Sequence, residues 1–429
     1  MTSKIKVGDR LALRSNFSAR GLEFLSCSGM LVEDVTVFSS SGFAEYDLDN
    51  DIAPTLHRFA VAAGPAPVLD ANEDYSDFES LLWRDSYGRL RSAEPLFTSC
   101  DATHSVNERR GLQIVSSLFE RLNDDAGNIN ATYGLASSFD VSTNTLTYTT
   151  GNVNTYTKLP GTFRAGDTVV LFTWSGKLIW TGKVSSATAS IGNSLYTVRL
   201  PQSITLPNNE RVVVQNASAS GAGFLIDNVL VRQVGCNGFR IKAPSGEIRN
   251  SSFIQVSKGG INCIPEYKLW PECGFITEGL RIVNNVFRET GLTTKDKIPG
   301  SDPLANTVWC APIIIRSDLY GSNAGEADFR SDSAYLLHQN IEISGNLFLD
   351  RYAPYALVMG GVKNVTVSGN TFGDCSVDGF DALPPILLLG GDGIEIRDND
   401  YADAVRAPYE IWTVGQVGSL TCTDRTNGG

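Results

Sequence analysis

The sequence predicts an all-β fold, namely a right-handed parallel β-helix of stacked coils with a small antiparallel β-barrel inserted between the coils. Three observations predict it. A short aliphatic–polar–aromatic pattern recurs along the chain, its copies are spaced by about one coil, and one internal stretch breaks the pattern. The composition agrees, because 41 Gly and only three Met among 429 residues suit a turn-dense β protein.

The recurring pattern is an aliphatic residue, then Asn or Ser three positions later, then an aromatic residue two positions further on. It occurs six times, at 114–119, 248–253, 282–287, 343–348, 367–372 and 396–401. Asn346 and Asn370 lie 24 residues apart, and Asn370 and Asn399 lie 29 apart, as coils with corner loops of varying length would require. A leucine-rich horseshoe is the structural rival, but the helical half of such a repeat is missing.

Each copy is expected to form a short strand whose aliphatic and aromatic side chains point into the coil. The Asn is expected at the corner of the coil, in left-handed backbone, where its side chain bonds to the Asn of the next coil. Successive strands would then stack in parallel about 4.8 Å apart.

The pattern divides the chain into three predicted parts. Residues 1–136 form the first coils, residues 137–215 form the inserted β-barrel, and residues 216–429 form the remaining coils. The insert is predicted from longer strands such as 168–173 and 211–214, which Gly-Asp, Ser-Gly and Asn-Asn turns separate. A long loop over one face is expected at 291–340.

Charge and hydropathy exclude several classes of partner. The net charge of −12 and the pI near 4.8 argue against nucleic acid, because phosphate contacts need clustered Lys and Arg. For the same reason a neutral glycan is a better partner than a polyanionic one. Neither a signal peptide nor an apolar stretch of about 18 residues is visible, so no membrane partner is expected. The sequence leaves a homo-oligomer open.

The cysteines predict free thiols rather than a metal site. Eight are present: Cys27, Cys100, Cys236, Cys263, Cys273, Cys310, Cys375 and Cys422. None forms a C-x-x-C pair, which disfavours zinc, and we expect no metal and no cofactor. Most should be buried thiols inside coils, and Cys263 with Cys273 is the first pair to examine for a disulfide.

A dense group of polar residues precedes the insert. Asp101 and Asp125 lie 24 residues apart, which predicts neighbouring positions on adjacent coils, whereas Asp124 and Asp125 should point to different sides of the backbone. Stacked carboxylates would lie about 5 Å apart, and a lateral offset would give the roughly 6.5–9.5 Å of inverting glycosidases. Neighbouring carboxylates also favour keeping one as a proton donor. The alternative is that these acids cap turns or bind calcium.

This region resembles the signature of glycoside hydrolase family 110, the exo-acting α-1,3-galactosidases. The resemblance rests on the segments Ser99-Cys-Asp-Ala-Thr-His104, Arg110-Gly111, Asn123-Asp-Asp-Ala-Gly-Asn-Ile-Asn-Ala-Thr-Tyr133, Gln215-Asn216, Phe224-Leu-Ile-Asp-Asn228 and Trp270-Pro-Glu-Cys-Gly274. It implies a parallel β-helix interrupted by a small barrel that removes terminal α-1,3-galactose by inversion, without a metal. It also implies a secreted or periplasmic location.

Carried onto this sequence, the resemblance implies that Asp101, Asp124 and Asp125 are the catalytic carboxylates, and it leaves open which one is the acid. His104 would bind sugar hydroxyls or orient Asp101, or else be structural. Glu272 would line the pocket, or else be a surface acid of a loop.

Three further residues are implied as substrate contacts. Trp270 would stack on a sugar face, or else pack. Where the family has Asn-Val-His-Gly-Thr-Tyr, this chain reads Asn128-Ile-Asn130-Ala-Thr-Tyr133, so a polar contact to the sugar is changed. The further N-terminal coils of the family are not recognisable before Val7.

A second resemblance points to a different substrate. Asn237-Gly-Phe-Arg-Ile-Lys242 is similar to the Arg-x-Lys stretch of polygalacturonases, which implies that Arg240 and Lys242 hold a uronate carboxylate. The Gly-His-Gly element of that family is missing, and the alternative for both residues is an exposed strand edge. A third hypothesis, from another class, is a non-catalytic glycan-binding or phage-spike-like β-helix, which a trimer would favour.

Overall fold

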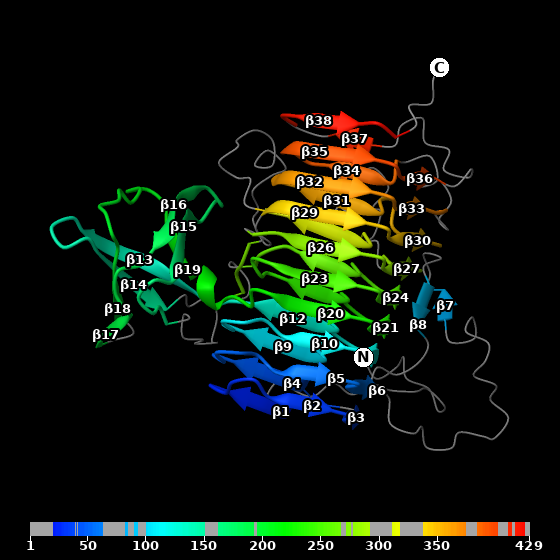
Figure 1. Ribbon diagram of the computed structural model, residues 1–429, viewed down its shortest axis with the longest axis horizontal. Coiled ribbons are helices and arrows are strands. Elements are labelled where there is room, and N and C mark those ends of the chain that lie inside the picture. Colours follow the sequence, from blue (N-terminus) through cyan, green and yellow to red (C-terminus); the bar gives the residue numbers. More distant parts are fainter. Residues whose placement is uncertain are drawn as a thin grey trace, which may run out of the picture.

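The chain winds into coils that stack three parallel β-sheets along one axis (Figure 1). The computed structural model describes residues 20–38, 40, 42–62, 82–84, 90–92, 100–150, 162–192, 195–266, 272–275, 278–291, 311–317, 338–374, 384–401, 411–413 and 417–424. Each complete coil contributes one strand to each sheet, and strands of neighbouring coils pair in parallel. The predicted parallel β-helix architecture is confirmed.

Sheet 1 carries the residues of interest and has ten strands. They are β1 (Arg20–Leu25), β4 (Phe43–Leu48), β9 (Thr103–Val106), β12 (Gly127–Asn130), β22 (Phe239–Ile241), β25 (Ile261–Cys263), β28 (Ile313–Arg316), β31 (Leu357–Gly360), β34 (Ile386–Leu388) and β37 (Ile411–Thr413).

Sheet 2 also has ten strands and sheet 3 has nine. Sheet 2 contains β2 (Leu31–Glu33), β5 (Thr55–His57), β10 (Gln113–Val115), β20 (Phe224–Asp227), β23 (Gly246–Arg249), β26 (Leu280–Val283), β29 (His338–Ser344), β32 (Val362–Ser368), β35 (Gly391–Arg397) and β38 (Leu420–Cys422). Sheet 3 contains β3 (Thr36–Phe38), β6 (Ala60–Ala62), β11 (Leu118–Leu122), β21 (Leu230–Val234), β24 (Ser252–Val256), β27 (Val286–Arg288), β30 (Leu347–Leu349), β33 (Thr371–Phe372) and β36 (Asp400–Tyr401).

The Asn of the repeat forms a ladder between sheets 2 and 3. The Nδ2 of Asn346 donates to Asn370 Oδ1 at 2.9 Å, and Asn370 Nδ2 donates to Asn399 Oδ1 at 2.9 Å. The predicted bonding from coil to coil is therefore confirmed. The predicted left-handed backbone is wrong by one position, because φ is positive at the preceding residue, for example 64° at Gly345 and 63° at Gly369. The turn is made there, which leaves the Asn side chain free to point inward.

The aromatic residue of the repeat stacks inside the coils. Phe253, Phe287, Phe348, Phe372 and Tyr401 follow one another with ring centroids 4.9–5.2 Å apart. All four Phe rings are fully buried in one continuous apolar core. The local pattern of the sequence thus becomes a column of rings along the axis.

A seven-stranded antiparallel sheet projects from the side of the coils, where an inserted barrel was predicted (Figure 1). Its strands are β13 (Tyr133–Asp140), β14 (Thr145–Thr150), β15 (Thr168–Thr173), β16 (Leu178–Lys183), β17 (Ala189–Gly192), β18 (Leu195–Arg199) and β19 (Val212–Asn216). The order is β16-β15-β19-β13-β14-β18-β17, so pairing among the described strands leaves β16 and β17 as edges rather than closing a barrel. A separate apolar core supports the sheet.

The stretch 291–340, predicted as a long loop, contains β28 and the start of β29. The apolar run Ile313-Ile-Ile is buried in sheet 1, and its polar neighbours concealed this strand in the sequence. Three shorter elements complete the described structure: the antiparallel strands β7 (Leu82–Arg84) and β8 (Leu90–Ser92), and the 3-10 turn η3 (Ala217–Ala219). None of the described helical structure is long and apolar enough to cross a membrane.

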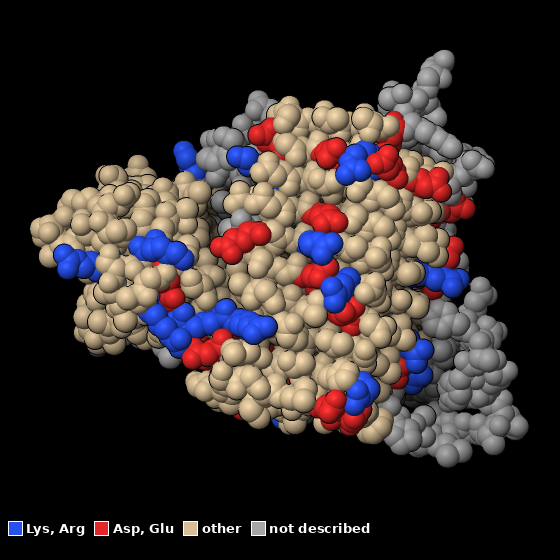
Figure 2. Space-filling model, in the orientation of Figure 1, with Lys and Arg blue, Asp and Glu red and all other residues tan. Residues whose placement is uncertain are grey.

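Free thiols and paired charges characterise the described residues. Cys27, Cys100, Cys236, Cys263, Cys273 and Cys422 are free, and Cys263 and Cys273 are buried thiols rather than a disulfide. On the face shown in Figure 2, acidic and basic side chains lie close together over the coils. Ion pairs between coils include Arg281 with Glu247 at 2.7 Å and with Glu342 at 2.9 Å.

Candidate functional site

The outward face of sheet 1 carries most of the predicted site residues. Phe239 and Ile261 belong to the apolar core and pair in one inward column with Gly127 and Thr103. Side chains alternate along a strand, so the next position in each strand faces outward. His104, Asn128 and Arg240 occupy that outward column on three consecutive strands, and Asn130 lies two positions further along β12.

Asp101 and Asp125 lie side by side at the start of this face. The backbone N–H of Ala102 donates to the Asp125 carbonyl at 3.1 Å, and the pairing of Thr103 with Gly127 continues the same register. Both residues are nearly covered, with 6% and 2% of their surfaces exposed. Asp101 and Asp125, which lie one coil apart in the sequence, are therefore direct neighbours in the structure.

Asp101 is held by His104. The Nδ1 of His104 lies 2.6 Å from Asp101 Oδ2, and Asn130 Nδ2 donates to His104 Nε2 at 3.4 Å. Because an amide nitrogen can only donate, the ring proton belongs on Nδ1 and points to Asp101. Burial raises the pKa of Asp101 well above its usual value, and the charges of Asp125 and Glu272 add to the shift. Asp101 is thus disposed to hold a proton.

Asp125 is held as an acceptor. Its Oδ1 accepts from the backbone N–H of Asn237 at 2.7 Å and from Asn237 Nδ2 at 2.8 Å. Its Oδ2 lies 3.8 Å from the Arg240 Nε. Two hydrogen-bond donors and a cation therefore surround this carboxylate. Asp101 and Asp125 have different polar partners although they are neighbours.

Asp124 does not point away from Asp125 as predicted. One carboxylate oxygen of each residue and the Cys236 Sγ lie within 4.8 Å of one another. The chain turns a corner before β12, so simple strand alternation does not apply there. The three atoms are of types that zinc accepts. The contacts of Cys236 and Asp125 argue against a metal site here, because the Lys258 Nζ lies 3.0 Å from the Cys236 sulfur and Asn237 already bonds to Asp125.

Arg240 is half-buried, Lys242 is buried, and both are paired with acids, so the alternative of an exposed strand edge is wrong. Arg240 Nη2 forms an ion pair with Glu266 Oε2. Lys242, whose side chain is fully covered, donates to Glu272 Oε2 at 2.5 Å and lies 3.7 Å from Glu266. Two cations and two carboxylates therefore neutralise one another beside Asp125.

Glu272 is a buried residue of this network rather than a surface acid. It is 7% exposed and accepts from Asn128 Nδ2 at 2.9 Å as well as from Lys242. Two backbone bonds between Cys273 and Ala131, of 2.8 and 2.7 Å, tie its segment to the end of β12. Trp270 lies outside the described residues.

Three residues of the site were not predicted. Glu266 pairs with Arg240, and Asn237 bonds to Asp125. Tyr46 stacks on His104, with ring centroids 5.6 Å apart and planes inclined by 12°. A signal existed for Tyr46, because Tyr46 on β4 is the register partner of His104 on β9. The long and irregular spacing between the two residues in the sequence concealed this pairing.

A second group of acids lies behind this face, inside the coil. Glu45 and Asp47 occupy the inward columns of β4, and Glu45, Asp47 and Glu108 are fully covered. Burial, with Asp47 and Glu108 adding repulsion, raises the pKa of Glu45 well above its usual value. Burial likewise raises the pKa of Asp47 to about 8 and that of Glu108 to about 10. Burial therefore favours the protonated form of these three acids in the folded protein.

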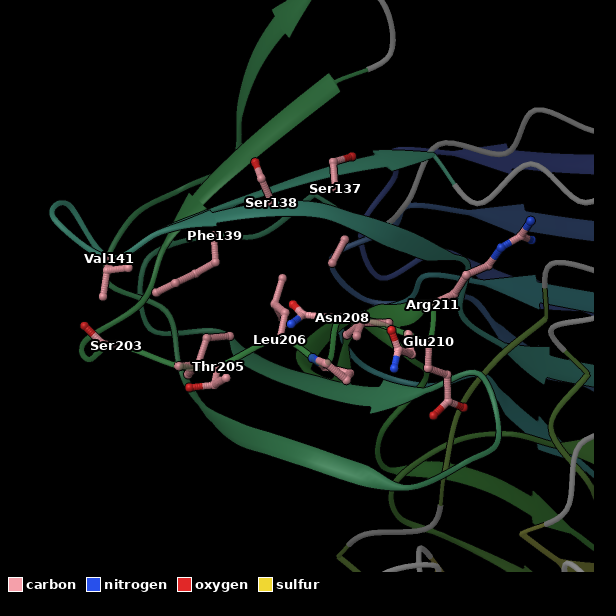
Figure 3. Close-up of a pocket in the computed structure, with 15 residues that line it drawn as sticks. Ser137, Ser138, Phe139, Val141, Ser203, Thr205, Leu206, Asn208, Glu210 and Arg211 are labelled. Atoms are coloured by element: carbon pink, nitrogen blue, oxygen red, sulfur yellow. The ribbon is translucent and has the colours of Figure 1, made fainter.

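A groove elsewhere does not involve the site. It has a volume of about 890 Å³ and lies on the antiparallel sheet, between β13 and the segment before β19 (Figure 3). Exposed Ser137, Ser138 and Asn208 line its rim, and half-buried Phe139 and Leu206 line its floor. None of the predicted site residues contributes to it.

Comparisons with known proteins do not assign a family. No family model matches the chain, and no curated protein matches it. A solved structure named "Glycoside hydrolase" aligns over 75% of this chain and 88% of its own, at 7% identity and a TM-score of 0.19. A similarity of that size carries no argument about function.

Proposed function

We propose that the protein is a glycoside hydrolase in which Asp101 is the general acid and Asp125 the general base. One observation carries the proposal: of two adjacent buried carboxyl groups, Asp101 has a pKa raised by burial, whereas Asp125 accepts two hydrogen bonds from Asn237. Such a pair of acid and base is what glycosidic bond hydrolysis needs. His104 keeps Asp101 oriented by donating to Oδ2, which leaves Oδ1 for the proton that goes to the leaving oxygen.

The proposed substrate is a terminal α-1,3-linked galactose, cleaved with inversion. Support for a neutral sugar comes from Arg240 and Lys242, whose charges Glu266 and Glu272 already neutralise. A uronate would have to displace one of these acids, so the polygalacturonase-like alternative is the weaker one. Galactose, the linkage and the inversion rest on the resemblance of residues 99–133 to the galactosidase family.

A second candidate is a non-catalytic glycan-binding β-helix. The observation in its favour is the low exposure of the site, with Asp101, Asp125 and His104 all at 6% or less. In that case the same residues are a buried polar network that stabilises the coils, and binding takes place elsewhere.

Hydrolysis assays on defined substrates test the proposal. The substrates are α-1,3-galactobiose, p-nitrophenyl α-galactoside and oligogalacturonate, assayed with wild type, Asp101→Asn and Asp125→Asn. Galactose release from the first, reduced about a thousandfold in both variants, is the expected result. Asp227→Asn is the control, since this acid bonds to Arg249 on sheet 2, outside the site. Activity on oligogalacturonate alone would favour the uronate substrate, and no activity on any substrate would favour the binding protein.

A further inference from the structure

We propose that Asn237 is the positioning residue for Asp125 and sets which of the two acidic groups carries the proton. The inference rests on the proposed function and names a residue outside the predicted set. Asn237 lies two residues before β22, one coil beyond Asp125, and is 3% exposed.

Asn237 holds a single oxygen of Asp125. Its backbone N–H donates to Oδ1 at 2.7 Å and its Nδ2 donates to the same oxygen at 2.8 Å. Two donors on Oδ1 fix the rotation of the carboxylate, so Oδ2 is the oxygen that remains to activate a water. Both donors also favour the ionised form, which a general base requires.

The amide of Asn237 is itself locked in the required orientation. Its Oδ1 accepts from the backbone N–H of Gly259 at 3.3 Å and from Asn262 Nδ2 at 3.2 Å. A backbone N–H can only donate, so the oxygen must face Gly259 and the nitrogen must face Asp125. The next coil thereby holds the base of the preceding one.

The proton balance of the site follows from this arrangement. Asp101 and Asp125 are adjacent, so ionising both is costly, and the first proton stays on the group whose charged form is less stabilised. Asp101 accepts one bond from a neutral imidazole, whereas Asp125 accepts two bonds and faces Arg240. Removing Asn237 Nδ2 should make the charged form of Asp125 less stabilised, and so closer to that of Asp101.

Asn237→Ser removes the Nδ2 donor that bonds to Asp125 Oδ1, puts a shorter hydroxyl side chain in its place and keeps the backbone donor. We expect kcat to fall about 10- to 100-fold with KM within twofold, because a lost bond to a charged group costs that much. The acid limb of the kcat profile should move to higher pH, and Asn237→Gln should recover part of the rate. Asn250→Ser is the matched control, since Asn250 Nδ2 donates to a carboxylate, Asp227, at 2.9 Å outside the site. General losses of stability would then appear in both variants.

A second measurement separates this inference from the proposed function. The protonation midpoint of Asp125, followed by the ¹³C signal of its carboxyl group, needs no substrate. In Asn237→Ser this midpoint should lie at higher pH than in wild type, because one donor to the carboxylate is lost. This holds even if wild type hydrolyses none of the substrates, a result that would refute only the proposed function. An unchanged midpoint, or an active Asn237→Ser with wild-type kcat and pH profile, would overturn the inference.

Discussion

Replacing Asp47 by Asn should weaken the dependence of stability on pH in the first coils. Asp47 points into the coil, is fully covered, and has raised pKa because of its burial. Among the residues that the structure describes, none donates a hydrogen bond to the nearby Glu45 carboxylate, and Asn50 donates two to Glu108, at 2.9 and 3.2 Å. The folded state therefore keeps protons that the unfolded chain releases.

The sign and size follow from linkage. The pKa of Asp47 is about 8 in the folded protein and about 3.9 in an unfolded chain, so the folded state binds the extra proton between these values. Stability contributed by this group is complete below about pH 4 and is lost as pH rises towards 8. The slope is about 1.4 kcal/mol per pH unit, or about 3 kcal/mol between pH 5 and pH 7.

Hydrogen exchange of β4 and β9 measures this effect locally. After correction for the intrinsic pH dependence of exchange, the opening free energy should fall from pH 5 to pH 7 in wild type. In Asp47→Asn the fall should be smaller by about 3 kcal/mol. Asp400→Asn, at an exposed position of β36, should leave the wild-type slope unchanged. An equal slope in wild type and Asp47→Asn would refute the reasoning, because it would mean that Asp47 is ionised when folded.

Three further predictions concern the ladder, the ion pairs and the acid. Asn346→Ala should lower the free energy of unfolding, measured in urea, by about 2–4 kcal/mol. The reason is that the backbone N–H and the Nδ2 of Asn285 both lose their acceptor, Asn346 Oδ1, which lies 3.0 Å from each. A loss below about 1 kcal/mol would contradict a stabilising role of the ladder. Glu272→Gln should lower the free energy of unfolding by about 3–5 kcal/mol, because it leaves the buried charge of Lys242 poorly paired. Adding Lys242→Met should recover most of this loss. No recovery would argue against the unpaired charge as the cause. Since the raised pKa of Asp101 keeps it protonated, kcat/KM should fall as pH rises past that pKa, and an alkaline limb unchanged in Asp101→Asn would exclude it as the acid.

Local periodicity predicted the coils because each repeat encodes one strand and one corner. The Asn ladder and the ring column connect residues one coil apart, so the spacing of Asn346 and Asn370 in the sequence was sufficient to predict their contact. The same reasoning brought Asp101 next to Asp125. It could not place Asn237, because the insert separates it from Asp125 by 112 residues and removes the period.

Alternation also fails where the core itself is polar. In β4 the sequence Phe-Ala-Glu-Tyr-Asp-Leu would place Tyr46 inside and the acids Glu45 and Asp47 outside. The structure does the opposite, because the register with β9 sets Tyr46 against His104 on the outer face. Pairing with neighbouring coils therefore overrides the local pattern at the site.

The stereochemistry of the released sugar shows whether Asp125 acts as a general base or as a nucleophile. Proton NMR during the first minutes of α-1,3-galactobiose hydrolysis separates the two anomers before they equilibrate. An acid at Asp101 and a base at Asp125 that activates water predict β-galactose as the first product. α-Galactose as the first product would contradict the account, because it would make Asp125 a nucleophile rather than a base.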